Sequence, residues 1–500
     1  MTIDRWISGR ASSHPDHPAI VFQGETWSYA DFEDRIAETT AALTAAGVGI
    51  GDRIAWYGLN RPEVFSLMFA CARLRAILCP LNWRLAAAEI AGIVDDCAPR
   101  LVVYDDHFAH PAQALAGEGR KVAHFATVPD LIRDRSPQAE APAQGRGGGE
   151  GADAPLLIVY TSGSTGRPKG AVLSQSAVEA SAVMSAEAHE MTDTDTALAC
   201  LPFFHVGGLN IIPGPVFLRG GTLEIHERFD PAEALAALQR IDTAVVVPTV
   251  LQAIMAQPGW AEADLSRLRL LSIGSTDVPV ELIEAVHACG VPLIQLYGAT
   301  ETSPLAIHQR RAEAMETVGS IGAPGSLADI RLMRDDGTDA PEGEPGEIWV
   351  RGPSILTEYW RNPAETAKSI EDGWFRTGDV ARRDADGRYW FMDRIKHVVI
   401  SGGENIYPAE LERVLRPHPK VREVAVVGRP DPKWGEIPVA VIAADGEMTE
   451  AEALSAFTGA LARYKHPKAA VFVDALPRNA MGKVVAADVR EMIGAKSGAA

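Results

Sequence analysis

Eleven consecutive residues, Tyr160 to Gly170, have the composition of a loop that binds phosphate groups. The segment reads YTSGSTGRPKG, and the apolar run Leu156 to Tyr160 that leads into it is typical of a buried strand. Glycines let backbone N–H groups approach phosphate oxygens closely, and a lysine supplies a positive charge. The residues that could contact phosphate are Thr161, Ser162, Gly163, Ser164, Thr165, Gly166 and Lys169. The GxxxxGK[ST] spacing of a Walker A loop is absent, so the pattern indicates a phosphate-binding loop of another kind.

A second segment places an aromatic ring and a carboxylate directly after a predicted strand. Tyr297 to Thr302 reads YGATET and follows Pro292 to Tyr297, whose sequence PLIQLY is typical of a buried strand. The Tyr297 ring offers a face on which a nucleotide base can stack, and the Glu301 carboxylate offers a hard oxygen ligand for Mg²⁺. Taken alone, the same residues would also fit a strand end followed by a solvated glutamate.

Three segments nearer the C-terminus contain charged residues suited to a nucleoside and to an anionic reaction. Trp374 to Val380 reads WFRTGDV, and the Asp379 carboxylate can accept hydrogen bonds from two ribose hydroxyls. Asp393 to Glu412 reads DRIKHVVISGGENIYPAELE, in which SGGEN would otherwise be a turn before a helix. Pro477 to Val484 reads PRNAMGKV, and the Lys483 ammonium can offset the charge that develops when one anion attacks another.

In this order, the five segments resemble the AMP-forming adenylating superfamily, which contains acyl-CoA synthetases, adenylation domains of peptide synthetases and firefly luciferases. The resemblance covers nearly the whole chain, and ISGGENIYPAELE is most similar to free-standing fatty-acyl or aryl-CoA ligases. It implies that ATP converts a carboxylic acid to an acyl-adenylate with release of pyrophosphate. The acyl group then passes to coenzyme A with release of AMP. ATP and coenzyme A are therefore the expected co-substrates, and Mg²⁺ is the expected cofactor.

The resemblance also implies roles for the residues that match the ATP site of the family. Tyr297 is expected to lie against the adenine, Thr300 to contact the α-phosphate and Glu301 to bind Mg²⁺. Asp379 and Arg394 are expected to contact the ribose.

Other matching residues are assigned by the resemblance to the two chemical steps. Lys483 would bridge the substrate carboxylate and the α-phosphate, whereas Gly402 and Gly403 would meet the thiol arm of coenzyme A. Lys396 would be the hinge of a mobile C-terminal domain. Motion is expected because adenylation needs Lys483 at the carboxylate, whereas thiolysis needs an open path for the sulfur. The sequence VVAADVR after Lys483 lacks the basic residues common there in the family, and we attach no loss of function to that departure.

The choice of acid depends on residues that resemble the acyl tunnel of the family. Leu201 to Gly208 reads LPFFHVGG, in which His205 is expected to gate or orient the carboxylate end of the acid. Gly207 and Gly208 are expected to leave room for the acyl body. Leu296 stands where synthetases for dicarboxylic acids resemble one another in carrying arginine, so an uncharged acyl body is favoured. Medium- or long-chain fatty acids and aromatic acids fit equally well.

Other functions stay open at this point. Transfer of the acyl group to a carrier protein is the enzymatic alternative, although no carrier domain follows Lys483. Luciferase-type oxidation would need a specialised substrate. A nucleotide-binding regulatory module without activity is the non-enzyme alternative, but such a protein should have lost Glu301, Asp379 or Lys483, and all three are present.

The composition is that of a large globular protein with an acidic surface. The 500 residues are 47% hydrophobic and 23% charged, with a formal net charge of −19 at pH 7. Because this charge repels nucleic-acid backbones and no basic run contains aromatic residues, nucleic-acid binding is not expected. None of the five cysteines forms a CxxC pair, Met1 to Pro18 lacks the apolar stretch of a signal peptide, and no apolar run reaches the ~20 residues of a membrane span. We expect a cytoplasmic enzyme, and a homodimer is compatible with the sequence.

Strands and helices that alternate along the first half of the chain must hold these segments in place. Apolar runs predict strands at Arg53–Tyr57, Thr243–Val247, Leu268–Ile273 and Pro292–Tyr297, and helices at Pro62–Leu74 and at Pro279–Cys289 with Gly290 as its cap. Strand, helix and strand in this order indicate parallel sheets covered by helices. The Ala-, Gly- and Pro-rich stretch Ser136 to Pro155 is expected to be a surface loop inside the same large domain.

A domain boundary is expected near Lys396. Before it, turn-rich segments such as Glu347 to Val350 and Tyr389 to Met392 predict a small β subdomain. After it, the pattern predicts helices at Pro408–Arg416 and Thr449–Arg463 and strands at Val424–Val427, Val439–Ile442 and Val471–Asp474. The expected fold class is therefore α/β. It comprises an N-terminal AMP-binding domain of parallel-rich sheets at 1–395 and a mobile α+β domain at 396–500.

Overall fold

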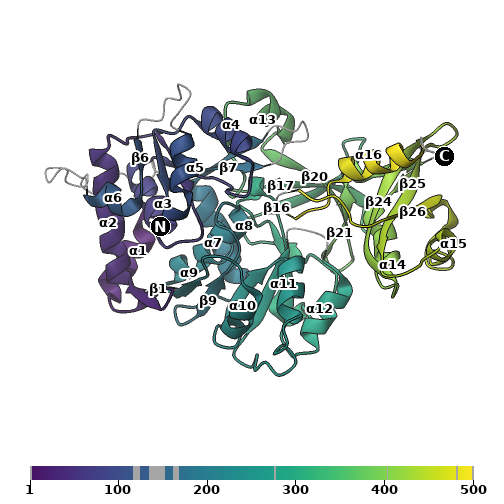
Figure 1. The fold of residues 1–500 in the computed structure, drawn as a ribbon, viewed down its shortest axis with the longest axis horizontal. Helices are drawn as coiled ribbons and strands as arrows, with labels where there is room; N and C mark the ends of the chain where they lie inside the picture. Colours follow the sequence, from purple (N-terminus) through teal and green to yellow (C-terminus); the bar gives the residue numbers. More distant parts are fainter. Residues whose placement is uncertain are drawn as a thin grey trace. The chain divides into compact units, whose positions relative to one another are not determined.

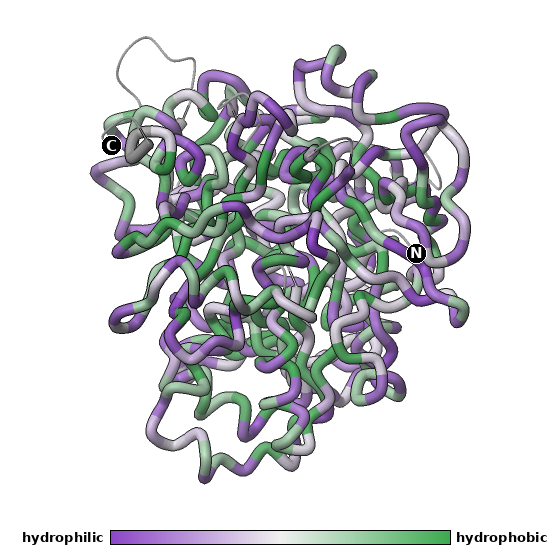
Figure 2. Tube along the Cα trace, turned by 90° about the vertical axis from the view of Figure 1, so that its right-hand side faces the viewer, coloured by the Kyte–Doolittle hydropathy of each residue, from purple (hydrophilic) through white to green (hydrophobic). Residues whose placement is uncertain are grey.

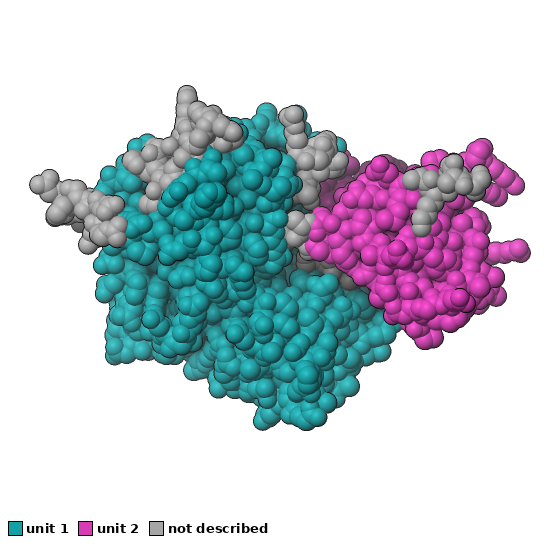
Figure 3. Space-filling view, viewed as in Figure 1, with its two compact units in different colours: residues 1–330, 350–375 teal, residues 331–349, 376–500 magenta. Residues whose placement is uncertain are grey.

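The computed structural model describes residues 3–115, 124–133, 152–161, 168–274, 278–401, 404–479 and 482–497. The chain divides into two compact units, drawn in teal and magenta in Figure 3. Unit 1 comprises Met1–Ile330 and Val350–Phe375, and unit 2 comprises Arg331–Trp349 and Arg376–Ala500. Most of the expected loop at 136–155 lies outside the described residues.

The larger sheet of unit 1 has nine strands within the described residues, in the order β15-β14-β13-β12-β11-β9-β10-β1-β2. Two of them, β1 and β9, are labelled in Figure 1. Its strands are β1 (Pro18–Phe22), β2 (Glu25–Ser28), β9 (Thr196–Ala199), β10 (Thr222–Ile225), β11 (Thr243–Val246), β12 (Leu270–Gly274), β13 (Leu293–Tyr297), β14 (Ile307–His308) and β15 (Ala323–Pro324). From β1 through β10, β9, β11 and β12 to β13 all pairings are parallel, and β2, β14 and β15 extend the sheet in antiparallel pairings.

A second sheet of unit 1 has the order β18-β8-β7-β4-β3-β5-β6 among the described residues. Its strands are β3 (Arg53–Tyr57), β4 (Ile77–Pro80), β5 (Leu101–Tyr104), β6 (His124–Ala126), β7 (Pro155–Thr161), β8 (Lys169–Ser174) and β18 (Glu358–Tyr359). The pairings from β7 through β4, β3 and β5 to β6 are parallel, and β8 and β18 add antiparallel pairings.

Helices pack on these sheets and bury apolar side chains. They are α1 (Trp6–Ser13), α2 (Tyr29–Ala45), α3 (Glu63–Leu74), α4 (Ala87–Cys97), α5 (Ala109–Ala114), α6 (Val128–Arg133), α7 (Gln175–Ala188), α8 (Val206–Asn210), α9 (Pro213–Arg219), α10 (Pro231–Leu238), α11 (Pro248–Met255), α12 (Val280–His287) and α13 (Pro363–Ser369). One core joins Leu271 and Leu293 of the nine-stranded sheet with Leu238, Leu251 and Ile283 of α10, α11 and α12. Each fully buried side chain of this kind contributes about 1.5–3 kcal/mol, so the helices hold the strand ends firmly.

Five strands of different lengths form the small sheet that the sequence predicts before Lys396. They are β16 (Asp329–Met333), β17 (Pro345–Arg351), β19 (Ile370–Glu371), β20 (Trp374–Arg383) and β21 (Tyr389–Arg394). Within unit 2, β20 and β21 pair in antiparallel register, with Asp379 opposite Arg394.

The C-terminal part of unit 2 is an α+β fold. Its sheet has the order β23-β22-β25-β24, with β26 beside β25. The elements are β22 (Val399–Ser401), β23 (Glu404–Ile406), α14 (Pro408–Leu415), β24 (Val421–Asp431), β25 (Gly435–Ala444), α15 (Glu450–Ser455), β26 (Ala469–Val473) and α16 (Ala486–Ser497). Alternate residues of β24 enter different cores: Val426 packs with Leu411 of α14, whereas Val427 packs with Val489 of α16. Both faces of the sheet are therefore covered by helices.

The structure confirms the expected α/β class and most of the predicted elements, and corrects two of them. The helix predicted at 449–463 ends at Ser455 with Ala456 as its cap, and it cannot continue to Arg463 because Gly459 has a left-handed φ of +82°. The helix predicted at 279–289 ends at His287 and is capped by Ala288 rather than Gly290.

Hydrophobic stretches are short throughout the trace and alternate with hydrophilic ones (Figure 2). Within the described ranges, no helix combines the length and the apolar character needed to cross a membrane.

Candidate active site

The phosphate-type loop predicted from the sequence closes a hairpin of unit 1. Thr161 ends β7, Lys169 begins β8, and the two residues are paired across the antiparallel strands. The remaining loop residues of the prediction are Ser162, Gly163, Ser164, Thr165 and Gly166, all of which lie outside the described residues. Of the expected phosphate contacts, the structure therefore places Thr161 and Lys169.

The Lys169 ammonium is largely buried, with 14% of its side chain exposed, and it has an acidic partner. It forms an ion pair with the Glu365 carboxylate and lies 5.7 Å from the centre of the Tyr359 ring. Glu365 belongs to the first turn of α13, where its backbone N–H donates to the Asn362 side chain that caps the helix. Pro363 fits the first position of that helix, so NPAE forms a local cap that fixes Glu365.

The YGATET segment makes a tight turn after β13. Gly298 is required there, because a Cβ at this position would lie 1.8 Å from the Pro304 carbonyl oxygen. Thr300 is buried and Glu301 is half-buried, both in the 3₁₀ turn Thr300–Thr302. Tyr297, the expected adenine contact, ends β13 and is 8% exposed.

The Glu301 side chain contacts a tyrosine that sequence reasoning does not single out. The Tyr359 hydroxyl donates to Glu301 Oε1 over 2.7 Å, and the Leu356 N–H donates to the Glu301 carbonyl over 2.8 Å. Tyr359 also faces Lys169, so the carboxylate expected to bind Mg²⁺ and the lysine expected to bind phosphate share one neighbour.

His205 caps the short helix α8. Its ring Nδ1 lies 3.1 Å from the Gly207 N–H, from which it accepts a hydrogen bond. Gly208 does not leave room for a substrate, because a Cβ there would lie 2.3 Å from the Pro202 carbonyl oxygen. The expectation that this glycine widens an acyl tunnel is therefore wrong: close backbone packing requires it.

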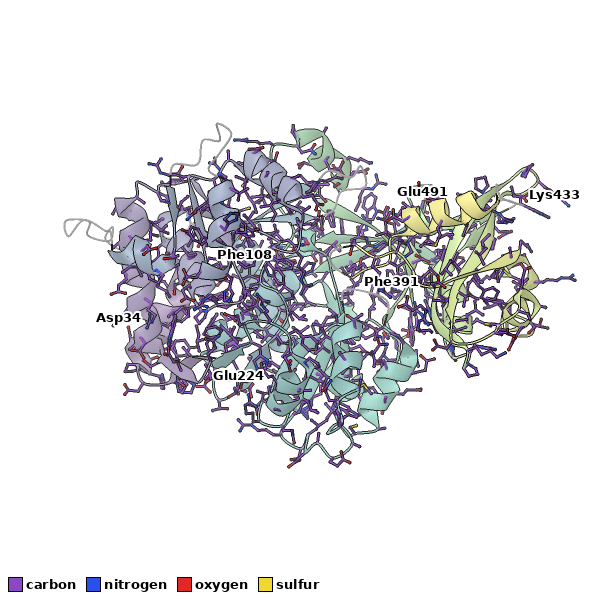
Figure 4. The ribbon with its side chains drawn as sticks, viewed as in Figure 1. Asp34, Phe108, Glu224, Phe391, Lys433 and Glu491 are labelled. Carbon is purple, nitrogen blue, oxygen red and sulfur yellow. The ribbon has the colours of Figure 1, made fainter. Side chains whose placement is uncertain are left out.

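Aromatic rings connect this segment to the second sheet. The ring centres of Phe204 and Trp83 are 6.1 Å apart, and those of Trp83 and Phe108 are 6.0 Å apart. Phe108 is labelled in Figure 4. Phe108 in turn lies 4.8 Å from Tyr57 of β3. Because these rings come from separate parts of unit 1, they fix the position of the LPFFH segment through packing.

Asn60, a second residue that the sequence reasoning does not include, holds the same segment by hydrogen bonds. Its Nδ2 donates to the carbonyls of Leu201 and His226 over 2.9 and 3.1 Å, and its Oδ1 accepts from the Phe203 N–H over 2.9 Å. Asn60 is 4% exposed and follows β3, whereas its partners follow β9 and β10. It therefore ties loops from the two large sheets together.

We expect Asn60→Ala to lower the free energy of unfolding by about 2–3 kcal/mol, because it leaves a buried N–H and two carbonyls without their partner. Urea-induced unfolding followed by circular dichroism measures the loss. The exposed Asn405→Ala serves as control and should change stability by no more than about 0.5 kcal/mol. Equal stability of both variants would contradict the assigned role of Asn60.

Unit 2 brings four of the predicted residues together. Arg394 Nε lies 3.0 Å from Asp379 Oδ1, and Asp379 is 4% exposed. Burial, together with the positive charges of Arg394 and Lys396, lowers the pKa of Lys483 to about 8, whereas the charge of Asp379 opposes this shift. Gly378 lies within β20 directly before Asp379 and has a φ of +70°, which explains the glycine in TGD.

Asp393 supports this cluster. Its carboxylate accepts hydrogen bonds from the N–H groups of Arg394 and Ala409, over 2.7 and 2.8 Å, and so joins the end of β21 to the start of α14. Lys396 is exposed in the 3₁₀ turn Ile395–His397 that follows. Gly402 and Gly403, the residues expected to meet coenzyme A, lie outside the described residues.

Two family profiles match the chain: AMP-binding enzyme over residues 7–360 and AMP-binding enzyme C-terminal domain over residues 410–483. The chain belongs to the AMP-binding enzyme family. Among family members, an indoleacetate–CoA ligase of Aromatoleum aromaticum is 42% identical, covering 99% of this chain and 99% of its own length. A feruloyl-CoA synthase of Amycolatopsis is 38% identical over 98% of both chains.

Solved structures of the family agree. The o-succinylbenzoate CoA synthetase of Bacillus subtilis, in complex with its acyl-adenylate intermediate, has a TM-score of 0.87 at 30% identity and covers 97% of this chain and 98% of its own. The same protein has been solved with ATP and a magnesium ion, with a TM-score of 0.86 at 30% identity over the same shares of the two chains.

Membership in the AMP-binding enzyme family confirms the predicted superfamily, the fold class and the enzyme class of AMP-forming acid–thiol ligase. ATP and coenzyme A as co-substrates fit a family whose named relatives are CoA ligases. The individual residue roles and the boundary between 395 and 396 stay predictions.

Proposed function

We propose that this AMP-binding enzyme is an aryl-CoA synthetase, which adenylates an aromatic carboxylic acid with ATP and then transfers the acyl group to coenzyme A. The observation that carries the chemistry is the charged cluster of unit 2, in which buried Asp379 pairs with Arg394 and the charges of both residues act on half-buried Lys483. The choice of an aromatic acid is supported by the two relatives named for indoleacetate and ferulate.

In unit 1, we propose that the loop from Thr161 to Lys169 binds the phosphates of ATP. Tyr297 stacks on the adenine and Thr300 donates to the α-phosphate. The Lys169 ammonium neutralises part of the charge of the departing pyrophosphate. His205 orients the carboxylate of the acid, and its half-buried position as the cap of α8 supports this role.

In unit 2, Asp379 and Arg394 bind the ribose hydroxyls and Lys483 stabilises the charge that develops as the carboxylate attacks the α-phosphate. We propose that the domain 396–500 reorients about Lys396 between adenylation and thiolysis, and that Gly402 and Gly403 then contact the thiol arm of coenzyme A. The exposure of Lys396 in a short turn supports a hinge there.

Glu301 is the residue proposed to bind Mg²⁺. Among the described residues, no group of three or more acidic, cysteine or histidine side chains could form a complete metal cage. Mg²⁺ is commonly held by one or two carboxylates together with substrate phosphates, so a single half-buried carboxylate with a hydrogen-bonded partner fits a Mg–ATP site. When bound, the ion would neutralise phosphate charge in the reaction.

We also propose that the enzyme is located in the cytoplasm and forms a homodimer. All five cysteines have free thiols, and four of them are buried, which suits a reducing compartment.

The test is AMP release with ATP, Mg²⁺ and coenzyme A across a panel of aromatic, fatty and dicarboxylic acids. We expect AMP release that depends on both an acid and coenzyme A and is fastest with aromatic acids. Preference for fatty acids would overturn the acyl class alone. Acid-dependent pyrophosphate exchange without turnover of coenzyme A would indicate a carrier-protein acceptor. Absence of both AMP release and pyrophosphate exchange with every acid of the panel would indicate a regulatory module.

The lowered pKa of Lys483 predicts the pH dependence of adenylation. Below a pH of about 8 the side chain is protonated and can offset anionic charge, and above it the charge is lost. Since kcat/KM reports the free enzyme, kcat/KM for pyrophosphate exchange should fall as the pH rises through about 8. Lys483→Arg keeps its charge throughout this range and should not show that decline, even if its rate is lower. The same decline in both proteins would exclude Lys483 as its origin.

A further inference from the structure

Tyr359 occupies an unusual position between two charged groups of unit 1. It lies on β18, which pairs with β8 directly after Lys169, so that Tyr359 is opposite Ala171. Its side chain is 5% exposed, yet it has a polar contact at its hydroxyl and a charged contact at its ring. The hydroxyl donates to Glu301 Oε1 over 2.7 Å, and the Lys169 ammonium lies 5.7 Å from the ring centre.

The direction of the hydroxyl bond follows from the two groups that form it. A phenol hydroxyl carries a proton and a carboxylate oxygen can only accept, so Tyr359 donates to Glu301 Oε1. With Oε1 occupied in this way, the orientation of the carboxylate is restricted and Oε2 remains for another partner.

The contact between the Tyr359 ring and Lys169 restricts the position of the ammonium. Lys169 is a flexible side chain, and its ammonium is confined by the Glu365 carboxylate and by the face of the Tyr359 ring. Cation–π contact of this kind favours one position of the ammonium among the many that a lysine can adopt.

Resting on the function proposed above, we propose that Tyr359 is a positioning residue that aligns the metal-binding carboxylate of Glu301 through its hydroxyl and the phosphate-binding ammonium of Lys169 through its ring. One side chain thus sets the spacing between the two groups that meet the triphosphate. The two contacts can be separated, since phenylalanine keeps the ring and removes the hydroxyl, whereas leucine removes both.

Equilibrium binding tests the proposal without turnover. Mn²⁺ serves as a paramagnetic probe, and α,β-methylene-ATP serves as a nucleotide that cannot be cleaved at the reacting bond. We expect Tyr359→Phe to weaken Mn²⁺ binding in the presence of this nucleotide by about tenfold, measured by electron paramagnetic resonance, because loss of a hydrogen bond to a ligating carboxylate typically costs that much. Binding of the nucleotide without metal, measured by calorimetry, should be unchanged in Tyr359→Phe and weakened several-fold in Tyr359→Leu.

Tyr29→Phe is the matched control. Tyr29 is also buried in unit 1, but its hydroxyl donates to the Gly221 carbonyl over 2.8 Å and not to a carboxylate. Its loss should leave Mn²⁺ binding unchanged. In a Glu301→Gln background, Tyr359→Phe should have no further effect on Mn²⁺ binding, because the ligand that it aligns is gone. Should Tyr359→Leu fail to fold, the Phe variant and this double variant still decide the role of the hydroxyl.

The outcomes distinguish this inference from the proposed function. Wild-type Mn²⁺ affinity in Tyr359→Phe, with a wild-type enzyme that releases AMP, would overturn the positioning role and leave the synthetase intact. A tenfold loss that persists in the Glu301→Gln background would also overturn it, because the effect would then arise elsewhere. A wild-type protein that binds Mn²⁺ with nucleotide but never releases AMP would refute the proposed function instead.

Discussion

Lys483→Ala should reduce the rate of adenylate formation by about 10²–10³-fold and leave thiolysis of a supplied acyl-adenylate unchanged. The two steps differ in their electrostatics. In the first, a carboxylate anion attacks an anionic α-phosphate, so a positioned ammonium stabilises the transition state. In the second, the acyl-adenylate already exists, and the reaction needs access for a sulfur rather than this charge. Acid-dependent pyrophosphate exchange measures the first step, and single-turnover thioester formation from purified adenylate measures the second.

Lys420→Ala provides the control for Lys483→Ala. Lys420 lies in unit 2 as well, but it is on the surface, 42% exposed, and pairs with Glu452 over 2.9 Å. Its removal should change neither step by more than about twofold, since surface ion pairs contribute little. Equal loss of both steps in Lys483→Ala would refute the division of labour and would indicate that the variant damages unit 2 as a whole.

Segments with several functional residue types in a row could be recognised from the sequence. YTSGSTGRPKG and YGATET follow strands, and the structure places Thr161 at the end of β7 and Tyr297 at the end of β13. Such strands are easy to predict because they are short, mostly apolar and bounded by turn residues. The opposition of Asp379 and Arg394 depends on strand register, which a sequence pattern alone does not give.

Residues that act through long-range contacts could not be predicted in the same way. Tyr359 and Glu301 are 58 positions apart, and Lys169 and Glu365 are 196 positions apart. Nothing in the local sequence distinguishes Tyr359 from an ordinary buried tyrosine until β18 is known to pair with β8. Asn60 is similar, because its partners belong to loops after β9 and β10.

The roles of individual glycines were the hardest to predict from the sequence, because one residue type serves several structural purposes. Gly208 suggested space for a substrate, but the structure uses it for backbone packing against Pro202. Gly290 suggested a helix cap, although the helix ends three residues earlier than that glycine, at His287. Only the backbone conformation and the neighbours at each position decide between these roles.

The position of Leu296 offers the clearest test of acyl specificity. It lies on β13 between Gly274 of β12 and His308 of β14, and it is 6% exposed. A Cβ added at Gly274 would lie 2.5 Å from the Leu296 carbonyl oxygen, so close backbone packing requires the glycine beside Leu296. Ligands of parallel sheets bind outside the carboxyl ends of the strands, which is where β12 and β13 end here.

We expect Leu296→Arg to lower kcat/KM for apolar aromatic acids by about 10²-fold, because an unpaired guanidinium in this buried position costs about 3 kcal/mol. For acids with a second carboxylate, kcat/KM should fall much less, since that carboxylate can pair with the new positive charge. Leu296→Met, which conserves volume, should remain within about tenfold of the wild type. Steady-state AMP release with both classes of acid measures the effect, and the melting temperature of each variant separates it from loss of stability. Unchanged kinetics in Leu296→Arg would mean that this side chain does not face the acid. An equal fall of kcat/KM for both classes of acid would mean that the charge of the new guanidinium does not cause the fall.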